Sequence, residues 1–166
     1  MGADSEAVRF GVIWGMPDRE FWQQIAERYA AAFGAELVGV AAFGSRARGT
    51  HRTDSDHDIL LVASGLSADV FQRSRQIRDP LRGLGAGVQV LARTPEDFLA
   101  DVTPLHLDLA LDAIVLHERD GFLSRNLARV RELLDEAGLY RTPKLFWRWK
   151  RTPRRDWAIE WQGVRI

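Results

Sequence analysis

Residues 43–62 read FGSRARGTHRTDSDHDILLV, a glycine-serine turn followed by two aspartates that open an apolar run. A strand places residues i and i+2 on one face, so Asp56 and Asp58 are expected to project together while His57 points the other way. Two like charges close together repel unless a cation lies between them, and a pair of carboxylates suits Mg²⁺. The spacing therefore predicts a metal site formed by Asp56 and Asp58.

The turn before the aspartates has the chemistry of a phosphate site. Glycine lets the backbone approach a ligand closely, and a turn of this kind can direct N–H groups at an anion. The hydroxyl group of Ser45 adds another donor. We therefore expect Gly44 and Ser45 to seat the phosphates of a nucleotide. Arg46 and Arg48 are candidate phosphate contacts, with solvated side chains of the turn as the alternative.

Asp-x-Asp pairs also occur in solvated loops, where they carry no chemistry. Here the pair leads directly into residues 59–62, an apolar run typical of a central strand. Another such run, residues 37–43, ends at the glycine-serine turn. Strand, turn, polar connection and second strand form one coherent unit, which favours the metal interpretation over the solvated loop.

The segment from Phe43 to Val62 resembles the signature of the nucleotidyltransferase fold shared with the DNA polymerase beta superfamily. It is most similar to the small bacterial and archaeal members, the minimal nucleotidyltransferases, through the Gly-Ser pair, the Arg-Ala-Arg-Gly that follows and the Asp-Ser-Asp-x-Asp spacing. The resemblance implies an α/β palm-like fold: a small mixed sheet, flanking helices and a helical C-terminal part. It implies that Gly44 and Ser45 contact phosphates and that Asp56 and Asp58 bind divalent metal.

The family normally supplies a third carboxylate from a later strand, and this chain departs there. Residues 87–93 read GVQVLAR, which places Gln89 at the aspartate's position. A neutral amide can accept a hydrogen bond or ligate weakly, but it cannot act as a carboxylate base or balance metal charge. Nucleotide binding should therefore survive better than transfer.

Three later carboxylates, Glu96, Asp97 and Asp101, are candidate substitutes for the missing one. The alternative is that residues 95–97 form the first turn of a helix, where acidic side chains interact favourably with the helix dipole. That pattern favours the structural interpretation.

The composition fits one compact domain. A chain of 166 residues, 46% of them hydrophobic, can bury a core but has little room for a second one. We expect a single domain over residues 1–166, with its core at about 20–102 and C-terminal helices and a tail at about 103–166. The net charge is zero, so the chain lacks the basic field of a processive DNA-binding protein.

The chain contains no cysteine, which excludes disulfides, thiolate metal sites and cysteine nucleophiles. No segment approaches the ~20 apolar residues of a membrane span. The first residues lack a basic region followed by an apolar one. We therefore expect a cytoplasmic protein that does not associate with membranes.

Hydrophobic periodicity predicts helices that alternate with the strands, as in an α/β sheet. The expected helices run from Pro17 to Ala32 or Phe33, and over 68–84, 104–116 and 122–137. Asp120 is the expected N-cap of the last helix, and Gly138 is its expected stop.

The C-terminal stretch at residues 141–157 concentrates basic and aromatic side chains, a mixture that stacks bases and neutralises phosphates. The alternative is a pair of short strands, with Trp147 and Trp149 on one face, that closes the hydrophobic edge of the domain. The period of two favours the strands, so nucleic-acid binding through this stretch is a partner that we do not favour.

These features predict an enzyme that moves a nucleotidyl group from a nucleoside triphosphate, with ATP the expected one, to an acceptor hydroxyl. Mg²⁺ or Mn²⁺ is the expected cofactor. Gln89 leaves a different class open, a non-catalytic nucleotide-binding module or an antitoxin-like module whose partner is a small helical protein. A third class, an RNA-binding module, would show salt-dependent affinity for RNA without nucleotide or metal.

Overall fold

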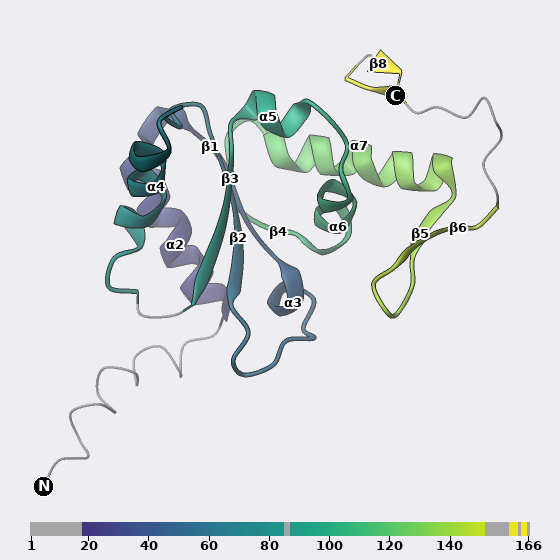
Figure 1. Cartoon of the computed structure of the whole chain (residues 1–166), viewed down its shortest axis with the longest axis horizontal. Coiled ribbons are helices and arrows are strands. Elements are labelled where there is room, and N and C mark those ends of the chain that lie inside the picture. Colours follow the sequence, from purple (N-terminus) through teal and green to yellow (C-terminus); the bar gives the residue numbers. More distant parts are fainter. Residues whose placement is uncertain (1–17, 85–86, 152–159, 163, 166) are drawn as a thin grey trace, which may run out of the picture.

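The computed structural model describes residues 18–84, 87–151, 160–162 and 164–165 (Figure 1). Along the chain the elements are α2 (Asp18–Phe33), the 3₁₀ turn η1 (Gly34–Glu36), β1 (Leu37–Phe43), α3 (Gly44–Ala47), β2 (His57–Ala63), α4 (Val70–Arg78), the 3₁₀ turn η2 (Asp79–Leu81), β3 (Val88–Arg93), α5 (Pro95–Leu99), α6 (Pro104–Asp112), β4 (Ile114–Glu118), α7 (Phe122–Ala137), β5 (Leu139–Arg141), β6 (Trp147–Trp149), β7 (Glu160–Trp161) and β8 (Val164–Arg165).

A four-stranded sheet in the order β3-β2-β1-β4 forms the centre of the molecule. Strand β1 pairs antiparallel with both β2 and β4, whereas β2 and β3 are parallel, so the sheet is mixed. The two central strands are almost entirely buried, which is what their apolar runs predict. The order places the turn after β1 on one side of β2 and the edge strand β3 on the other.

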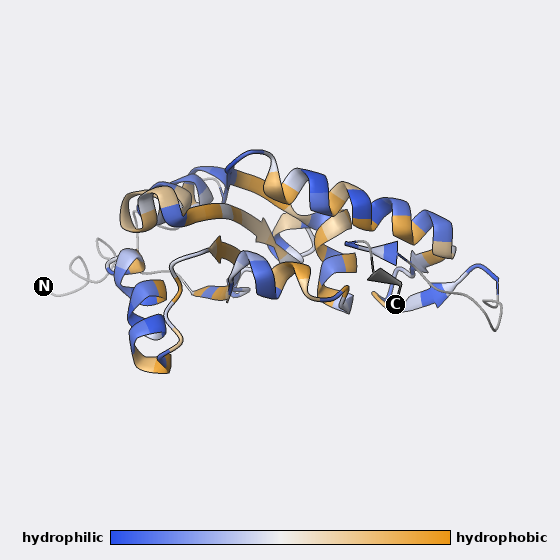
Figure 2. Cartoon of the chain, turned by 90° about the horizontal axis from the view of Figure 1, so that it is seen from above, coloured by the Kyte–Doolittle hydropathy of each residue, from blue (hydrophilic) through white to orange (hydrophobic). Residues whose placement is uncertain are grey.

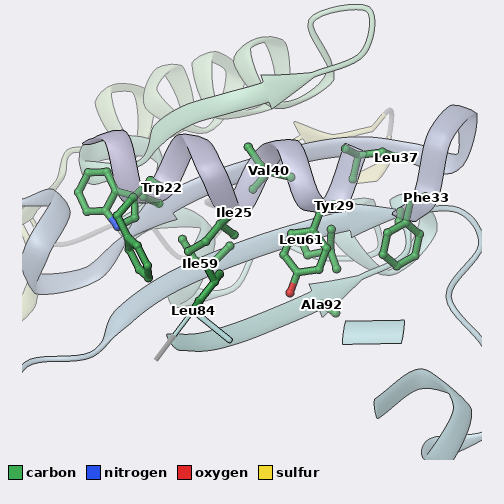
Figure 3. Close-up of a cluster of buried hydrophobic side chains, with 14 of the residues drawn as sticks. Trp22, Ile25, Tyr29, Phe33, Leu37, Val40, Ile59, Leu61, Leu84 and Ala92 are labelled. Atoms are coloured by element: carbon green, nitrogen blue, oxygen red, sulfur yellow. The ribbon is translucent and has the colours of Figure 1, made fainter. Parts of the chain in front are cut away.

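Helix α2 covers one face of the sheet. Its apolar residues recur at helical spacing, and Ile25 and Tyr29 pack against Ile59 and Leu61 of β2 (Figure 3). All four side chains are fully buried. Burial of a large apolar side chain contributes about 1.5–3 kcal/mol, so this face of the sheet is a major part of the core.

Helices α5, α6 and α7 cover the opposite face, where Phe98, Leu109 and Leu123 pack against Leu60 and Val62 of β2 (Figure 1). In a view from above, the central strands are largely hydrophobic, whereas the helices alternate between hydrophobic and hydrophilic stripes (Figure 2). Each helix thus turns one stripe to the sheet. Within the described ranges, no helix is both long enough and apolar enough to cross a bilayer.

Several predicted elements are confirmed. Helix α2 ends at Phe33, strand β1 spans residues 37–43, and α7 spans residues 122–137. Gly138 ends α7 in the left-handed conformation, with φ 65°. Pro17, the expected first residue of α2, lies outside the described residues.

The predicted helix over residues 104–116 is wrong in its last part. Helix α6 ends at Asp112, Ala113 is already extended with ψ 134°, and the chain continues as β4. Ile114 and Val115 are β-branched and pair with the edge of β1 that β2 leaves free. The fourth strand of the sheet therefore comes from a segment that the periodicity assigned to a helix.

The predicted helix over residues 68–84 is shorter in the structure. Helix α4 begins after Asp69, whose side chain accepts a hydrogen bond from the Gln72 amide, and it ends at Arg78. Pro80 has no N–H group to donate the next helical hydrogen bond, and the chain continues as a 3₁₀ turn. The N-cap predicted for α7 is also wrong, because Gly121 takes that position with φ 64°.

A short antiparallel hairpin of β5 and β6 follows α7 and confirms the predicted pair of strands. Trp147 is half-buried and packs against the cluster of α6 and α7, while the Arg141 guanidinium lies 6.0 Å from the centre of its ring. Trp149 and Phe146 are exposed. The rest of the basic and aromatic stretch, residues 152–157, lies outside the described residues.

Candidate functional site

The pairing of β1 with β2 brings Gly44 next to Asp58. Phe43 pairs with Asp58 across the two strands, so the turn that begins at Gly44 lies beside that carboxylate. Gly44 has φ 77°, and a Cβ atom at this position would overlap the Asp58 carboxylate. A glycine is therefore required here both by the left-handed backbone and by the close approach of the aspartate.

Asp56 lies against a second glycine. Its Oδ1 atom occupies the space that a Cβ of Gly87 would need, and its Oδ2 atom accepts a hydrogen bond of 2.7 Å from Gln89 Nε2. His57 points to the other face, where it is buried and its Nδ1 accepts a hydrogen bond of 3.0 Å from Trp22 Nε1. The alternation expected of an extended chain is thus present at Asp56, His57 and Asp58.

The two aspartates form a negatively charged pair. Burial and the neighbouring charge of Asp56 raise the pKa of Asp58, and the charge of Arg48 acts in the opposite direction. In the described part of the chain, neither aspartate has a cationic side chain within 4.0 Å. Carboxylates that lack a cationic partner are the donors that Mg²⁺ prefers, so these residues fit a divalent cation.

Gln89 occupies the position that was predicted for the third group. It pairs with Asp58 in the parallel ladder of β2 and β3, and its amide donates to Asp56. Among the residues that the structure describes, no third histidine or carboxylate joins Asp56 and Asp58. The site therefore offers two carboxylates and one amide.

The candidate substitute carboxylates lie elsewhere. Glu96 and Asp97 are in the first turn of α5, where the Asp97 amide donates to the Thr94 side chain that caps the helix. Gln89 is near the beginning of β3 and Thr94 follows its end, a separation of about 15 Å along the strand. Asp101 follows α5 and is farther still along the chain. The structure does not bring these three to the aspartate pair.

The Ser45 hydroxyl group is available to a ligand. Its side chain is half-buried and makes no hydrogen bond to any described residue, while its carbonyl oxygen accepts from the Thr50 amide at 2.9 Å. The hydrogen bond between the Thr50 amide and the Ser45 carbonyl oxygen closes the turn. The turn is thereby held beside the aspartates without using the Ser45 hydroxyl.

Arg46 holds the turn to the rest of the protein. Its guanidinium pairs with Asp18 of α2 at 3.1 Å, and its Nε donates to the Ser55 carbonyl oxygen at 2.8 Å. Ser55 immediately precedes Asp56. Arg46 therefore connects the turn, the helix α2 and the approach to the aspartate pair.

Arg48 belongs to an ion-pair network that the sequence did not reveal. It pairs with Asp112 of α6 at 3.0 Å, and Arg141 of β5 forms two further bonds of 2.5 and 2.6 Å to the same carboxylate. Arg141 also reaches Asp108 at 3.0 Å. No sequence signal joins these residues, because they lie on different elements and meet only in the folded chain.

Burial would raise the pKa of the Asp112 carboxyl, but the hydrogen bonds from Arg141 and Arg48 outweigh it and hold this pKa below its ordinary value. Asp112 is therefore charged and stabilises both guanidinium groups. The network fixes Arg48, which follows the turn, to helix α6 and to the β5–β6 hairpin.

The family described as "Nucleotidyltransferase domain" matches residues 19–128, which include the whole four-stranded sheet, both aspartates and Gln89. A protein of Methanocaldococcus jannaschii named "Putative protein adenylyltransferase MJ1305" is 28% identical over 120 residues. The match covers 69% of this chain and 79% of that relative.

Two solved structures also resemble the chain. One, described as a "putative nucleotidyltransferase from Sulfolobus solfataricus", is 25% identical with a TM-score of 0.46, and the match covers 72% of this chain and 94% of the other. The second is a toxin-antitoxin structure with AMP-PNP, 18% identical with a TM-score of 0.47, covering 69% of this chain and 90% of the other.

Proposed function

The chain belongs to the nucleotidyltransferase domain family, and we propose that it transfers a nucleotidyl group from a nucleoside triphosphate to an acceptor hydroxyl. The observation that carries this proposal is the pair of Asp56 and Asp58 beside the glycine-serine turn, two carboxylates that have no ion pair with any described residue. A structural carboxylate pair would be expected to have a basic neighbour, because uncompensated like charges destabilise a fold.

Each part of the site has a separate role in this proposal. Asp56 and Asp58 would hold Mg²⁺ or Mn²⁺, which neutralises charge on the phosphates when it is bound. Gly44 lets the turn approach the Asp58 carboxylate, and the Ser45 hydroxyl donates to a phosphate oxygen. Gln89 orients Asp56 through its hydrogen bond but cannot accept the proton of the acceptor.

Arg46 and Arg48 remain proposed phosphate contacts. Both guanidinium groups already hold the turn through Asp18 and Asp112. A guanidinium has five N–H donors, so a contact with phosphate would share these groups instead of replacing their ion pairs. In the structure described, the ion pairs of Arg46 and Arg48 fix the conformation of the turn.

We propose ATP as the nucleotide and a protein hydroxyl as the acceptor. The name of the Methanocaldococcus relative supports both choices, and the match includes most of that protein. ATP and a protein acceptor thus come to this chain by analogy within the family.

The proposal predicts metal-dependent binding and transfer. Wild-type protein with α-labelled ATP, Mg²⁺ and a cell extract as the acceptor pool should label an acceptor, and calorimetry should detect ATP binding that a chelator abolishes. The double variant Asp56→Asn with Asp58→Asn should lose both while its circular dichroism spectrum stays native, because each change keeps the side-chain volume. Equal affinity in the double variant would contradict the metal site.

A second candidate function is favoured by Gln89, which stands where the family places its third carboxylate and donates to Asp56. On this alternative the chain binds a nucleotide, or a small helical protein partner as an antitoxin does, without turnover. The same labelling experiment separates the two functions. Nucleotide binding without transfer to any acceptor would support the binding module.

A further inference from the structure

The β5–β6 hairpin has one packed face and one open face. Trp147 packs against the cluster of α6 and α7, and Arg141, on the same face, forms its ion pairs with α6. Tyr140 and Arg148 pair across the two strands and project from the opposite face, where both are exposed. The fold thus uses one face of the hairpin and leaves the other to solvent.

The loop of the hairpin carries two exposed apolar side chains. Leu145 is 49% exposed and Phe146 is 63% exposed. The Leu145 amide donates to the Thr142 carbonyl oxygen at 2.9 Å, and the Phe146 amide donates to Thr142 Oγ1 at 3.1 Å. These bonds fix the loop, so its apolar side chains are organised in advance for contact with another molecule.

Leu145 is held in a conformation that the fold does not explain. Its φ is 63°, in the left-handed region, where glycine or asparagine would be less strained than a bulky side chain. The side chain is exposed, so burial does not offset the strain. A contact with a partner gives a reason for leucine at this position.

The hairpin is also a basic surface. Residues 139–151 include five basic residues and no acidic one. Arg141 is neutralised by α6, whereas the other four side chains make no hydrogen bond or ion pair with any described residue. These four are Lys144, Arg148, Lys150 and Arg151. The surface is therefore complementary to an acidic ligand.

The surroundings of the hairpin favour an acidic protein segment over a nucleic acid. Helix α7, which leads into the hairpin, exposes Glu132, Asp135 and Glu136 near its end. A nucleic acid carries a charge at every phosphate and needs cations along its whole path, so these carboxylates would repel it. Leu145 offers no ring on which a base could stack. A short protein segment with acidic side chains and one apolar side chain needs the hairpin alone.

Asp112 connects the hairpin to the candidate site. Its carboxylate binds Arg141, at the start of the hairpin loop, and also Arg48, whose charge acts on Asp58. Asp58 lies on the same face of β2 as Leu60, which packs against the cluster that includes α6. In Figure 1 the hairpin loop lies at the same end of the molecule as α3. A segment bound to the hairpin can thus extend toward the aspartate pair from the side of α6.

We propose that the β5–β6 hairpin docks the protein acceptor, through an acidic segment whose apolar side chain packs on Leu145 and Phe146. The inference rests on the proposed function. In the transfer the acceptor oxygen bonds to the α-phosphorus, the bond from that phosphorus to the oxygen bridging to the β-phosphorus breaks, and pyrophosphate leaves with the electron pair. The hydroxyl proton passes to water. The hairpin binds the acceptor and takes no part in these bond changes.

The first test separates contact from folding at Leu145. The probe is a fluorescent peptide with several Asp residues, one Leu and one Tyr. Leu145→Asn should keep or raise the Tm, because it relieves the left-handed leucine, while the affinity for the peptide falls about tenfold. Val70→Asn is the matched control, since Val70 is an exposed apolar residue on α4, and it should bind the peptide as the wild type does. A lower Tm with unchanged binding would assign Leu145 to the fold and overturn the proposal.

The second test reverses two charges of the hairpin. With α-labelled ATP and Mg²⁺, the double variant Lys144→Glu with Arg148→Glu should raise KM for the acidic peptide about tenfold and leave kcat and ATP affinity unchanged. A peptide with Lys in place of Asp should be labelled better by this variant than by the wild type. The matched control is Arg75→Glu with Arg78→Glu, two exposed residues of α4, which should leave KM for the acidic peptide unchanged.

The outcomes distinguish this inference from the proposed function. Peptide binding is measured without ATP or metal, so it tests the hairpin independently of turnover. Hairpin-dependent binding without labelling would overturn the transfer and support the docking surface. Labelling that the hairpin variants leave unchanged would support the transfer and overturn the docking surface. Failure of the wild type to bind the acidic peptide, or binding of single-stranded oligouridylate in its place, would overturn the acidic protein segment.

Discussion

Gly44 and Gly49 differ in one physical respect. Both have positive φ, 77° and 71°, but only at Gly44 would a Cβ meet a neighbouring side chain, the Asp58 carboxylate. At Gly49 the space within 4 Å is empty. A substitution at Gly49 therefore measures the cost of the left-handed backbone alone. A substitution at Gly44 measures that cost together with the cost of displacing Asp58.

We expect Gly49→Ala to lower the free energy of unfolding by about 1–2 kcal/mol, the cost of a left-handed alanine, and to leave ATP binding unchanged. Gly44→Ala should cost more and should abolish Mg²⁺-dependent ATP binding, because Asp58 must move. Urea unfolding and calorimetry on both variants would check this. Normal ATP binding in Gly44→Ala would show that the position of Asp58 is not critical.

Gln89→Asp tests what the missing carboxylate does. The change restores an anion beside Asp56 and Asp58, so metal-dependent transfer should rise, with general-base contributions of about 10²–10⁴-fold as the scale. Without metal the variant should have a lower Tm, since a hydrogen bond donor is replaced by a third like charge. Labelled-ATP assays and thermal unfolding with and without Mg²⁺ would measure both effects.

Gln89→Asn is the matched control, because it has the length of aspartate without its charge. It should not gain transfer. If the wild type already turns over rapidly and Gln89→Asp leaves its rate unchanged, another residue supplies the missing function, and Gln89 does not weaken catalysis.

At the level of elements, Asp112 joins the turn after β1, helix α6 and the β5–β6 hairpin through Arg48 and Arg141. We expect Asp112→Asn to lower the free energy of unfolding by about 2–4 kcal/mol, because two guanidinium groups lose a charged partner that is 7% exposed. Glu132→Gln, which breaks an exposed pair with Arg129, should change stability by less than about 1 kcal/mol. Urea titrations would compare them.

The same carboxylate predicts a dependence on pH. The pKa of Asp112 is held below its ordinary value of 3.8, so the native state binds fewer protons than the unfolded state. The stabilisation is present above the ordinary value and is lost as the pH falls through and below it. Asp112→Asn should therefore lose less stability between pH 7 and about pH 3 than the wild type loses. An equal loss of stability in the variant and the wild type would show that Asp112 does not contribute to the acid sensitivity.

The elements differ in how well the sequence predicts them. Helix α7 has a regular apolar stripe and a stop at Gly138, and both are local signals. Strand β4 has no such local signal, because residues 104–116 are largely apolar and only pairing with β1 decides where the helix ends and the strand begins. Pro80 was a local signal for the early end of α4 that the periodicity outweighed.

The aspartate pair could be placed from the sequence because the period of a strand fixes the relation of residues i and i+2. The ion pairs of Arg46 and Arg48 could not, since they are tertiary contacts that form only when the turn packs against α2 and α6. The sequence predicted the residues of the turn but not what holds them.

At the level of the whole molecule, binding at the site should stabilise the fold. A ligand that binds only the native state adds about 2.7 kcal/mol at a hundred times its Kd, which corresponds to a rise in Tm of about 5–10 °C for a chain of this size. ATP with Mg²⁺ should produce this rise in a thermal scan, and ATP with a chelator should not. The double aspartate variant is the control, and a rise in that variant would place binding elsewhere.

The pairing of the strands also orders the events of folding. Phe43 pairs with Asp58, Asp58 with Gln89, and Ala42 with Ile114, so the separation of the partners along the chain increases in that sequence. Closing a longer loop costs more entropy, and distant pairings form later. The β1–β2 hairpin, which carries the turn and both aspartates, is thus the most local unit of the sheet. On a growing chain, the turn and both aspartates can therefore come together before the ribosome has released β3, the strand that carries Gln89.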